Sequence, residues 1–348
     1  MNRAFESTRK PRVGITLGDP AGIGPEIVLK SVADAEVRES CLPVIVGNRN
    51  ELATQAERLG LPNSYPLVTN ADELAEARAY PIVFDTSGAP GPIVPGQLSA
   101  AAGSQAIAAV ETAVSLCLGG DLDAIVTAPV NKEALKLAGS PHPGHTEMLS
   151  ALCGGAPPLM CFFAGDLRVF LLTVHTSLSE AIAAITSSKV VESVVLAHRE
   201  LQRFGAREPR IAVAGLNPHA GEHGLFGNEE LREIEPAIEQ CRREHRIDVS
   251  GPYPADTIFV RAWRGEFDAV AACYHDQGLI AVKCLAFGKA VNVTLGLPII
   301  RTSVDHGTAF DIAGRGVADH SSMIEAIKRA AWLVQHQQTN TGTKETTR

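Results

Sequence analysis

The 348-residue sequence has few aromatic side chains and no strongly basic segment. Phe, Tyr and Trp together make up 5% of the residues, so a core must be built mainly from Ala, Val, Leu and Ile. The formal net charge is −8, and the densest basic stretch, residues 242–246, is interrupted by Glu244. Nucleic acids and anionic membranes are therefore excluded as main partners, because neither is attracted to an acidic surface without a basic patch.

The sequence also lacks long hydrophobic runs and paired cysteines. No stretch approaches the length of a membrane span, and residues 1–11 carry charges without the apolar core of a signal peptide. The seven cysteines are odd in number and form no CxxC pair, which favours free thiols in a reducing compartment over a disulfide framework. These absences predict a cytoplasmic protein with no membrane attachment.

The sequence does contain a regular alternation of short apolar runs and amphipathic stretches. Buried strands are predicted at 13–17, 44–46, 82–84, 124–127, 159–163, 169–174, 211–214 and 269–273. Helices are predicted at 27–33, 51–59, 105–118, 132–137, 190–204, 229–244 and 322–336. This alternation indicates an α/β fold with a mainly parallel sheet. The length suggests two domains, and without a long linker their boundary must run through Gly- and Pro-rich loops.

The segment from Gly18 to Glu26 lies between a predicted strand and a predicted helix. It has neither the GxGxxG dinucleotide spacing nor a Walker loop. Two interpretations remain open. The segment is either a tight turn with Pro25 in the first helical turn, or a cradle of backbone N–H groups that binds an anion.

Polar side chains at two further places suit an anionic ligand. His145 and Thr146 precede a short helical pattern, where Thr146 is either an N-cap or, with His145, a donor to a substrate. Lys283, Asn292 and Arg301 lie in apolar runs, where a buried cation is costly unless it is paired. In one interpretation, Lys283 and Arg301 extend their charged ends to solvent or form structural ion pairs. In the other, they bind a phosphate or carboxylate, which suits the forked guanidinium of Arg301.

Three histidines, His175, His219 and His275, each follow a predicted strand. The carboxyl ends of parallel strands meet at one edge of a sheet, so these rings can converge and hold a metal with one position open. Glu222 and Asp276 are candidates for orienting the rings. A single histidine is more often a structural residue, and that alternative stays open for each of the three.

The loop from Asp305 to Gly316 is too rich in small residues to belong to the core. A flat ligand such as adenine can lie on such a loop, within reach of its backbone groups. The alternative is a flexible connection, against which Phe310 and Ile312 argue.

This loop resembles the adenosine-binding loop of the isocitrate/isopropylmalate dehydrogenase superfamily, and the segment 18–26 is similar to the N-terminal turn of that superfamily. With 144–147, 215–222, 274–278 and 301–309, the sequence resembles the 4-hydroxythreonine-4-phosphate dehydrogenase family over nearly its whole length. The resemblance implies two α/β/α domains of isocitrate/isopropylmalate dehydrogenase-like type, with the active site in the cleft between them. Their predicted extents are 1–128 plus 300–348, and 129–299.

The resemblance also assigns residues to the parts of this site. It implies a homodimer with a shared active site, in which both subunits contribute ligands to Zn²⁺, or to Mg²⁺, Mn²⁺ or Co²⁺. The metal ligands fall on His175, His219 and His275. Contacts to the small-molecule substrate fall on His145, Thr146, Lys283, Asn292 and Arg301. The cofactor, NAD or NADP, binds at His306, Gly307, Thr308, Ala309, Asp311 and Gly314.

The implied reaction is oxidation of a phosphorylated β-hydroxy acid, followed by loss of CO₂. The substrate is 4-phosphohydroxy-L-threonine of the vitamin B6 pathway or a related four-carbon acid phosphate. A divalent cation on the hydroxyl eases hydride departure, and a general base is also required, for which Asp276, Asp256 and Lys283 are candidates. The alternatives are a terephthalate-type cis-dihydrodiol dehydrogenase, a non-redox metal-binding protein and a phosphate acyltransferase-like enzyme.

Overall fold

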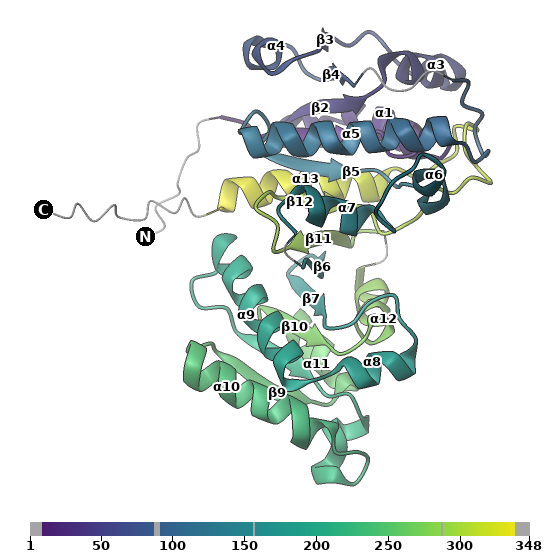
Figure 1. Cartoon of the computed structure of the whole chain (residues 1–348). Coiled ribbons are helices and arrows are strands. Elements are labelled where there is room, and N and C mark those ends of the chain that lie inside the picture. The colour runs from purple at the N-terminus through teal and green to yellow at the C-terminus, as the bar shows by residue number, and fades with distance from the viewer. Residues whose placement is uncertain (1–8, 87–90, 156, 287, 338–348) are drawn as a thin grey trace, which may run out of the picture.

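One mixed sheet runs through the whole molecule (Figure 1). The computed structural model describes residues 9–86, 91–155, 157–286 and 288–337, so the ends of the predicted first domain, 1–8 and 338–348, lie outside the described residues. Within the described ranges, twelve strands follow the order β3-β4-β2-β1-β5-β12-β11-β6-β7-β10-β8-β9. Neighbouring strands are parallel except where β6 pairs with β7 and β11, and where β11 pairs with β12. The predicted α/β fold with a mainly parallel sheet is confirmed.

The upper lobe in Figure 1 contains the first half of this sheet. Its strands are β1 (Arg12–Thr16), β2 (Leu42–Gly47), β3 (Leu67–Val68), β4 (Ile82–Asp85), β5 (Ala124–Thr127) and β12 (Arg301–Ser303). Its helices are α1 (Gly24–Ala33), α2 (Ala35–Ser40), α3 (Arg49–Leu59), α4 (Ala71–Glu76), α5 (Ala100–Gly119) and α13 (Ser321–His336). The chain leaves β1 towards β2, while β5 lies on the other side of β1, so the strand order reverses between β1 and β5. Open α/β sheets usually bind ligands at the carboxyl ends of strands beside such a reversal.

The lower lobe continues the sheet. Its strands are β6 (Leu159–Ala164), β7 (Leu167–Leu171), β8 (Ile211–Ala214), β9 (Val249–Tyr253), β10 (Ala269–Ala272) and β11 (Val291–Leu295). Its helices are α8 (Leu178–Ala184), α9 (Ser187–Arg203), α10 (Glu235–His245), α11 (Ala255–Trp263) and α12 (His275–Ala286), with irregular turns η1 (Pro218–Gly224) and η2 (Glu230–Ile234). The connecting helices α6 (Lys132–Leu137) and α7 (His145–Leu152) pack against α5. The domain limits at 128/129 and 299/300 stay predictions.

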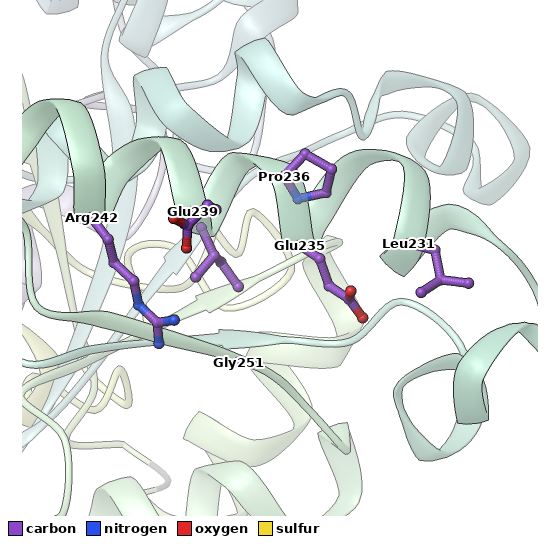
Figure 2. A pocket seen from close by; sticks show the side chains of 7 residues that line it. Leu231, Glu235, Pro236, Glu239, Arg242 and Gly251 are labelled. Carbon is purple, nitrogen blue, oxygen red and sulfur yellow. The ribbon is translucent and has the colours of Figure 1, made fainter.

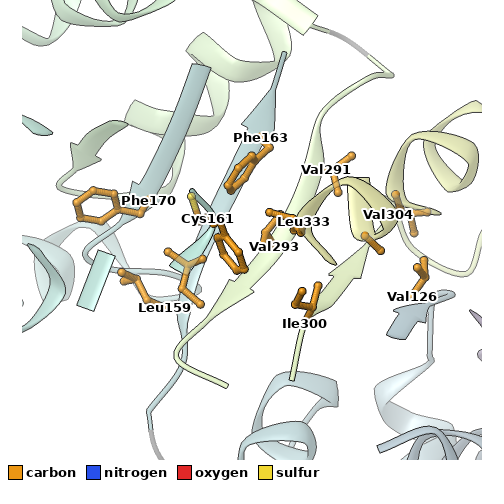
Figure 3. Close-up of a cluster of buried hydrophobic side chains, with 14 of the residues drawn as sticks. Val126, Leu159, Cys161, Phe163, Phe170, Val291, Val293, Ile300, Val304 and Leu333 are labelled. Atoms are coloured by element: carbon orange, nitrogen blue, oxygen red, sulfur yellow. The ribbon is translucent and has the colours of Figure 1, made fainter. Parts of the chain in front are cut away.

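The main hydrophobic cluster extends through both lobes. Figure 3 shows the part of it where β6, β7 and β11 meet β12 and α13. Most of its members are Ala, Val, Leu or Ile, as the low aromatic content predicts, with Phe163 and Phe170 among the largest fully buried side chains. All seven cysteines are free, and four of them are buried, so the predicted free thiols are confirmed.

The prediction that no stretch approaches the length of a membrane span is wrong for one helix, α5. The 20 residues of α5 are long and apolar enough to cross a membrane, and α8 and α9 together pass the same test as a pair bent by 84°. Half of the α5 window is buried, and α5 packs against β1, β2 and β5. Because the core helix of a sheet protein meets the same criteria, this is weak evidence for a membrane span.

The segment 18–26 anchors the loop 305–316. The Glu26 carboxylate is buried at 2% exposure and accepts three hydrogen bonds. The donors are Lys30 Nζ at 2.7 Å and the backbone N–H groups of Gly316 at 3.2 Å and Ala318 at 2.7 Å. The backbone N–H of Ile23 donates to the carbonyl of Thr308 over 3.0 Å and is therefore not available to an anion. These contacts favour the tight turn over the anion cradle.

We expect Glu26→Ala to lower the free energy of unfolding by roughly 2–4 kcal/mol, because three donors lose a buried acceptor. Chemical denaturation monitored by circular dichroism measures this change. Glu57→Ala is the control, since Glu57 is exposed on α3, and its effect should stay within about 0.5 kcal/mol. Equal effects of the two substitutions would show that Glu26 does not anchor the loop.

Candidate functional site

Arg301 is the centre of a polar cluster where β12 pairs with β5 and β11. The residue is 4% exposed, and its guanidinium donates to Thr127 Oγ1 (3.1 Å from Nε, 2.7 Å from Nη2) and to Thr294 Oγ1 (2.8 Å from Nη1). Burial lowers the pKa of Arg301 to about 10, so the group stays charged at neutral pH. No carboxylate of the described chain forms a salt bridge with it, and a buried charge without a counter-ion is costly.

Two more side chains of this cluster have buried polar atoms without a partner. His145 Nε2 and Asn292 Oδ1 are inaccessible and make no hydrogen bond within the described residues. Asn292 pairs with Ser303 across β11 and β12, which places it on the same face of the sheet as Arg301. Burial, and secondly the charge of Arg301, lowers the pKa of His145 well below 6.5, so its ring is neutral. Native proteins leave few buried polar atoms unsatisfied, so these atoms and Arg301 indicate a ligand site. Arg301 and a protonated His145 Nε2 can donate to an anion, and Asn292 Oδ1 can accept from a hydroxyl group of the ligand.

The helix α7 begins two residues earlier than expected. Gly144, in an extended conformation, is its N-cap, and His145 is its first residue. The interpretation of Thr146 as an N-cap is therefore wrong, because Thr146 already lies within the first turn. It is partly exposed beside His145, and its role as a substrate donor stays a prediction.

His175 and His275 come together after the neighbouring strands β7 and β10. Their ring centroids are 5.8 Å apart. His275 Nδ1 lies 2.7 Å from Asp276 Oδ1, which orients the ring and leaves its Nε2 available as a ligand. Burial, and then the charges of Lys132 and His275, lower the pKa of His175, which favours the neutral imidazole that binds metals.

His219 does not join this pair within one chain. It lies in a left-handed turn in which residues 219–223 all have φ between +43° and +80°. Buried Glu230 holds the start of this turn by accepting hydrogen bonds from the backbone N–H (2.7 Å) and the side-chain amide (2.9 Å) of Asn217. The His219 ring lies 5.9 Å from that of Phe226. In the part of the chain that the structure describes, no three His, Cys, Asp or Glu side chains form a metal-binding group. The trio stays a prediction that depends on the partner subunit.

The three candidates for the general base lie in different surroundings. A cavity beside His275 is lined by both Asp276 and Lys283. The Asp276 side chain is 75% exposed and engaged by His275, and Lys283 Nζ lies 3.9 Å from Asp305 Oδ2. Asp256 is exposed in the first turn of α11, which packs against η1, the turn that bears His219. The structure therefore brings two of the candidates to the histidine pair and not the third.

The loop 305–316 lies beside the start of α1, with its backbone fixed by the contacts described above. The predicted cofactor contacts His306, Gly307 and Asp311 are exposed, and Thr308, Ala309 and Gly314 are partly buried. Ala309 and Gly314 have φ of 42° and 73°, so the loop follows a specific tight course. A fixed backbone with accessible polar groups suits a ligand, and the binding of a dinucleotide stays a prediction.

Sequence reasoning missed several residues of this region. They are Thr127 and Thr294, which bind Arg301, Asp305, which pairs with Lys283, and Lys132 and Glu147, which lie beside Gly144. The sequence offered one signal, for Lys132: the polar residues 131–133 come shortly after the predicted strand 124–127. The threonines could not be found, because their role depends on the register of strands far apart in the sequence.

A separate groove runs along α10 beside Gly251 of the edge strand β9 (Figure 2). Its lining includes Glu235, Glu239 and Arg242, and none of the predicted site residues. Arg242 Nε already donates to the carbonyl of Val249 over 2.7 Å. This groove is not part of the candidate site.

Comparison with known proteins gives a consistent result. The family described as pyridoxal phosphate biosynthetic protein PdxA matches residues 39–330. The chain is 47% identical over 324 residues to D-threonate 4-phosphate dehydrogenase of Cupriavidus necator, which covers 93% of this chain and 97% of that protein. It is 46% identical over 322 residues to 4-hydroxythreonine-4-phosphate dehydrogenase of Desulfosudis oleivorans, with coverage of 92% and 95%. The crystal structure of 4-hydroxythreonine-4-phosphate dehydrogenase from Klebsiella pneumoniae has a TM-score of 0.84 and 40% identity, over 96% of this chain and 100% of that chain.

Two more distant structures bear on the alternatives. A terephthalate 1,2-cis-dihydrodiol dehydrogenase from Burkholderia xenovorans has a TM-score of 0.66 at 29% identity, over 93% of this chain and 98% of that chain. A branched-chain phosphotransacylase from Enterococcus faecalis has a TM-score of 0.51 at 12% identity, which shows a shared fold alone.

Proposed function

Because the chain belongs to the PdxA family of pyridoxal phosphate biosynthetic proteins, we propose that it is a dehydrogenase that oxidises a phosphorylated four-carbon hydroxy acid. The observation that carries this proposal is the buried Arg301 without a carboxylate partner. A guanidinium has five N–H donors, and Arg301 uses three of them on two threonines, so two remain for a phosphate group. The unpartnered His145 Nε2 is an additional donor to the phosphate when it carries the ring proton, and Asn292 Oδ1 is an acceptor for a hydroxyl group of the same substrate.

A divalent metal is part of this proposal. His175 and His275 fit as two of its ligands, because both rings lie together, one has its Nδ1 engaged by Asp276, and the other is held neutral. His219 of the partner subunit is proposed as the third ligand, in a homodimer with a shared active site. A bound divalent cation stabilises the negative charge that develops on the substrate oxygen and makes hydride loss easier. Zn²⁺ suits a three-histidine set, and Mg²⁺, Mn²⁺ and Co²⁺ are alternatives.

The hydride acceptor in this proposal is NAD or NADP, held along the loop 305–316. Asp311 is exposed on that loop and is a candidate contact to the adenosine half. Oxidation of a β-hydroxy acid gives a β-keto acid, and we infer that CO₂ is then lost. Lys283 is better placed than Asp256 for proton transfer, because it lines the cavity beside His275.

The relatives favour two substrates, and the chain is almost equally similar to the enzymes named for them. A screen of the purified protein decides between them. D-threonate 4-phosphate and 4-phosphohydroxy-L-threonine are each supplied with NAD or NADP and with Zn²⁺, Mg²⁺, Mn²⁺ or Co²⁺, and nicotinamide reduction is followed by absorbance. Turnover of either phospho-acid supports the proposal. Oxidation of an aromatic cis-diol alone would favour the terephthalate-type alternative, and metal binding with no reduction would favour a non-redox protein.

A further inference from the structure

Lys132 carries a positive charge that forms no salt bridge within the described residues, although the Glu147 carboxylate lies nearby. Lys132 is exposed and is the first residue of α6, directly after the N-cap Asn131. This segment follows β5, where the strand order reverses. The Lys132 ammonium makes no hydrogen bond or salt bridge within the described residues, whereas Lys283 has Asp305 at 3.9 Å. Segments after strand ends at such a reversal commonly supply ligand-binding side chains.

The Lys132 side chain lies beside Gly144, and its charge acts on His175. A Cβ built on Gly144 would lie 3.2 Å from Lys132 Cε and 3.7 Å from its Nζ, so the side chain passes over the residue before His145. On the other side, the charge of Lys132 reaches His175: after burial, it is the next largest cause of the lowered His175 pKa. Lys132 thus passes beside the residue that precedes His145, and its charge acts on His175 of the histidine pair.

Because Gly144 has no side chain, the end of the Lys132 side chain can occupy the space beside it. A Cβ there would also lie 2.8 Å from Glu147 Oε2, the end of a flexible side chain. The φ of Gly144 is −169°, an extended conformation that any residue adopts. Alanine at this position would therefore displace the ends of Lys132 and Glu147 without straining the backbone.

We propose that Lys132 binds the carboxylate of the substrate acid. The inference rests on the proposed function, because it takes the phosphate end of the same molecule to be held by Arg301. A four-carbon acid phosphate carries anionic groups at both ends, so with its phosphate on Arg301 its carboxylate extends towards the histidine pair. A lysine ammonium, a compact charge on a flexible stem, is suited to meet it there.

Isothermal titration of the full-length protein with D-threonate 4-phosphate and with inorganic phosphate tests this role. Lys132→Met should weaken binding of the phospho-acid roughly 10- to 100-fold, the effect of losing one charge-assisted hydrogen bond, and should leave inorganic phosphate binding unchanged. Gly144→Ala should weaken phospho-acid binding in the same selective way. Lys136→Met, one turn further along α6 and also exposed, is the control and should change neither affinity.

Three results would overturn the proposal. Equal losses for both ligands in Lys132→Met would place Lys132 in the phosphate site, and no loss would remove it from the substrate site. The third result concerns the protein without substitutions. If it binds the phospho-acid no more tightly than inorganic phosphate, a carboxylate contact is excluded while the phosphate site remains supported. Binding of neither ligand would instead refute the proposed function itself, which separates the two failures.

Discussion

Replacing Arg301 with methionine should raise the KM for the phosphorylated acid roughly 10²- to 10³-fold while the KM for the nicotinamide cofactor changes little. Arg301 keeps one N–H donor free on each Nη nitrogen, and each charge-assisted hydrogen bond from such a donor to a phosphate oxygen contributes about 1.5–3 kcal/mol. The loop 305–316, where the cofactor is proposed to bind, is fixed by α1 and not by Arg301. Initial rates with each substrate varied in turn measure both constants.

Stability separates this effect from misfolding. Burial of an uncompensated guanidinium is unfavourable, and replacing a buried charge with an apolar side chain of similar length often costs little or stabilises. We therefore expect the unfolding midpoint of Arg301→Met to fall little or to rise. Arg301→Lys should also lose most phosphate affinity, because an ammonium cannot reproduce the fork. Arg199→Met, on the exposed face of α9, is the control for loss of a positive charge. A similar rise in both KM values for Arg301→Met would contradict the phosphate assignment.

Mixing two inactive variants should restore activity. His175→Ala and His219→Ala chains are each expected to lose metal and turnover as homodimers. The proposed site takes His175 and His275 from one chain and His219 from the partner. In a heterodimer of the two variants, one site then receives only unchanged histidines, and the other site carries both substitutions. Random mixing makes about half of the dimers heterodimers, so about a quarter of the wild-type metal content and activity should return.

The pair His175→Ala and His275→Ala is the matched control. The structure places these two rings in one chain, 5.8 Å apart, so every site of their heterodimer lacks one ligand and no activity should return. Metal content by elemental analysis and turnover are measured on the same mixed samples. Heterodimers of the first pair purified through two different affinity tags should reach about half of the wild-type values, because one of their two sites is intact. Restoration in the control pair, or none in the first pair, would show that the metal site is not divided in this way.

The sequence predicted the regular parts of the fold well, because their signals are local. The strands at 124–127 and 211–214 and the helix at 132–137 match β5, β8 and α6. All four residues of β5 and of β8 are buried, and continuous apolar runs of this length are typical of parallel strands with both faces covered. Strand order then explains why His175 and His275 meet, since β7 and β10 are neighbours whose carboxyl ends share one edge.

The parts that sequence could not predict depend on contacts between distant segments. Nothing local indicates that Glu230 and Asn217 hold the turn at His219 in a left-handed conformation, which costs about 1–2 kcal/mol for each residue other than glycine. Such strain persists mainly at functional sites, where surrounding contacts fix it. The contacts of Arg301 likewise depend on the pairing of β12 with β5 and β11, which no single segment determines.

The phosphate assignment is tested most directly by comparing the phosphorylated acid that the protein oxidises fastest with the same acid without its phosphate. Initial rates of nicotinamide reduction give kcat/KM for both compounds under one set of conditions. We expect the phosphorylated acid to be favoured at least about 10²-fold, because the donors of Arg301 and His145 lose their acceptor when the phosphate is removed. Equal kcat/KM values for the two acids would contradict the assignment of Arg301 to the phosphate group.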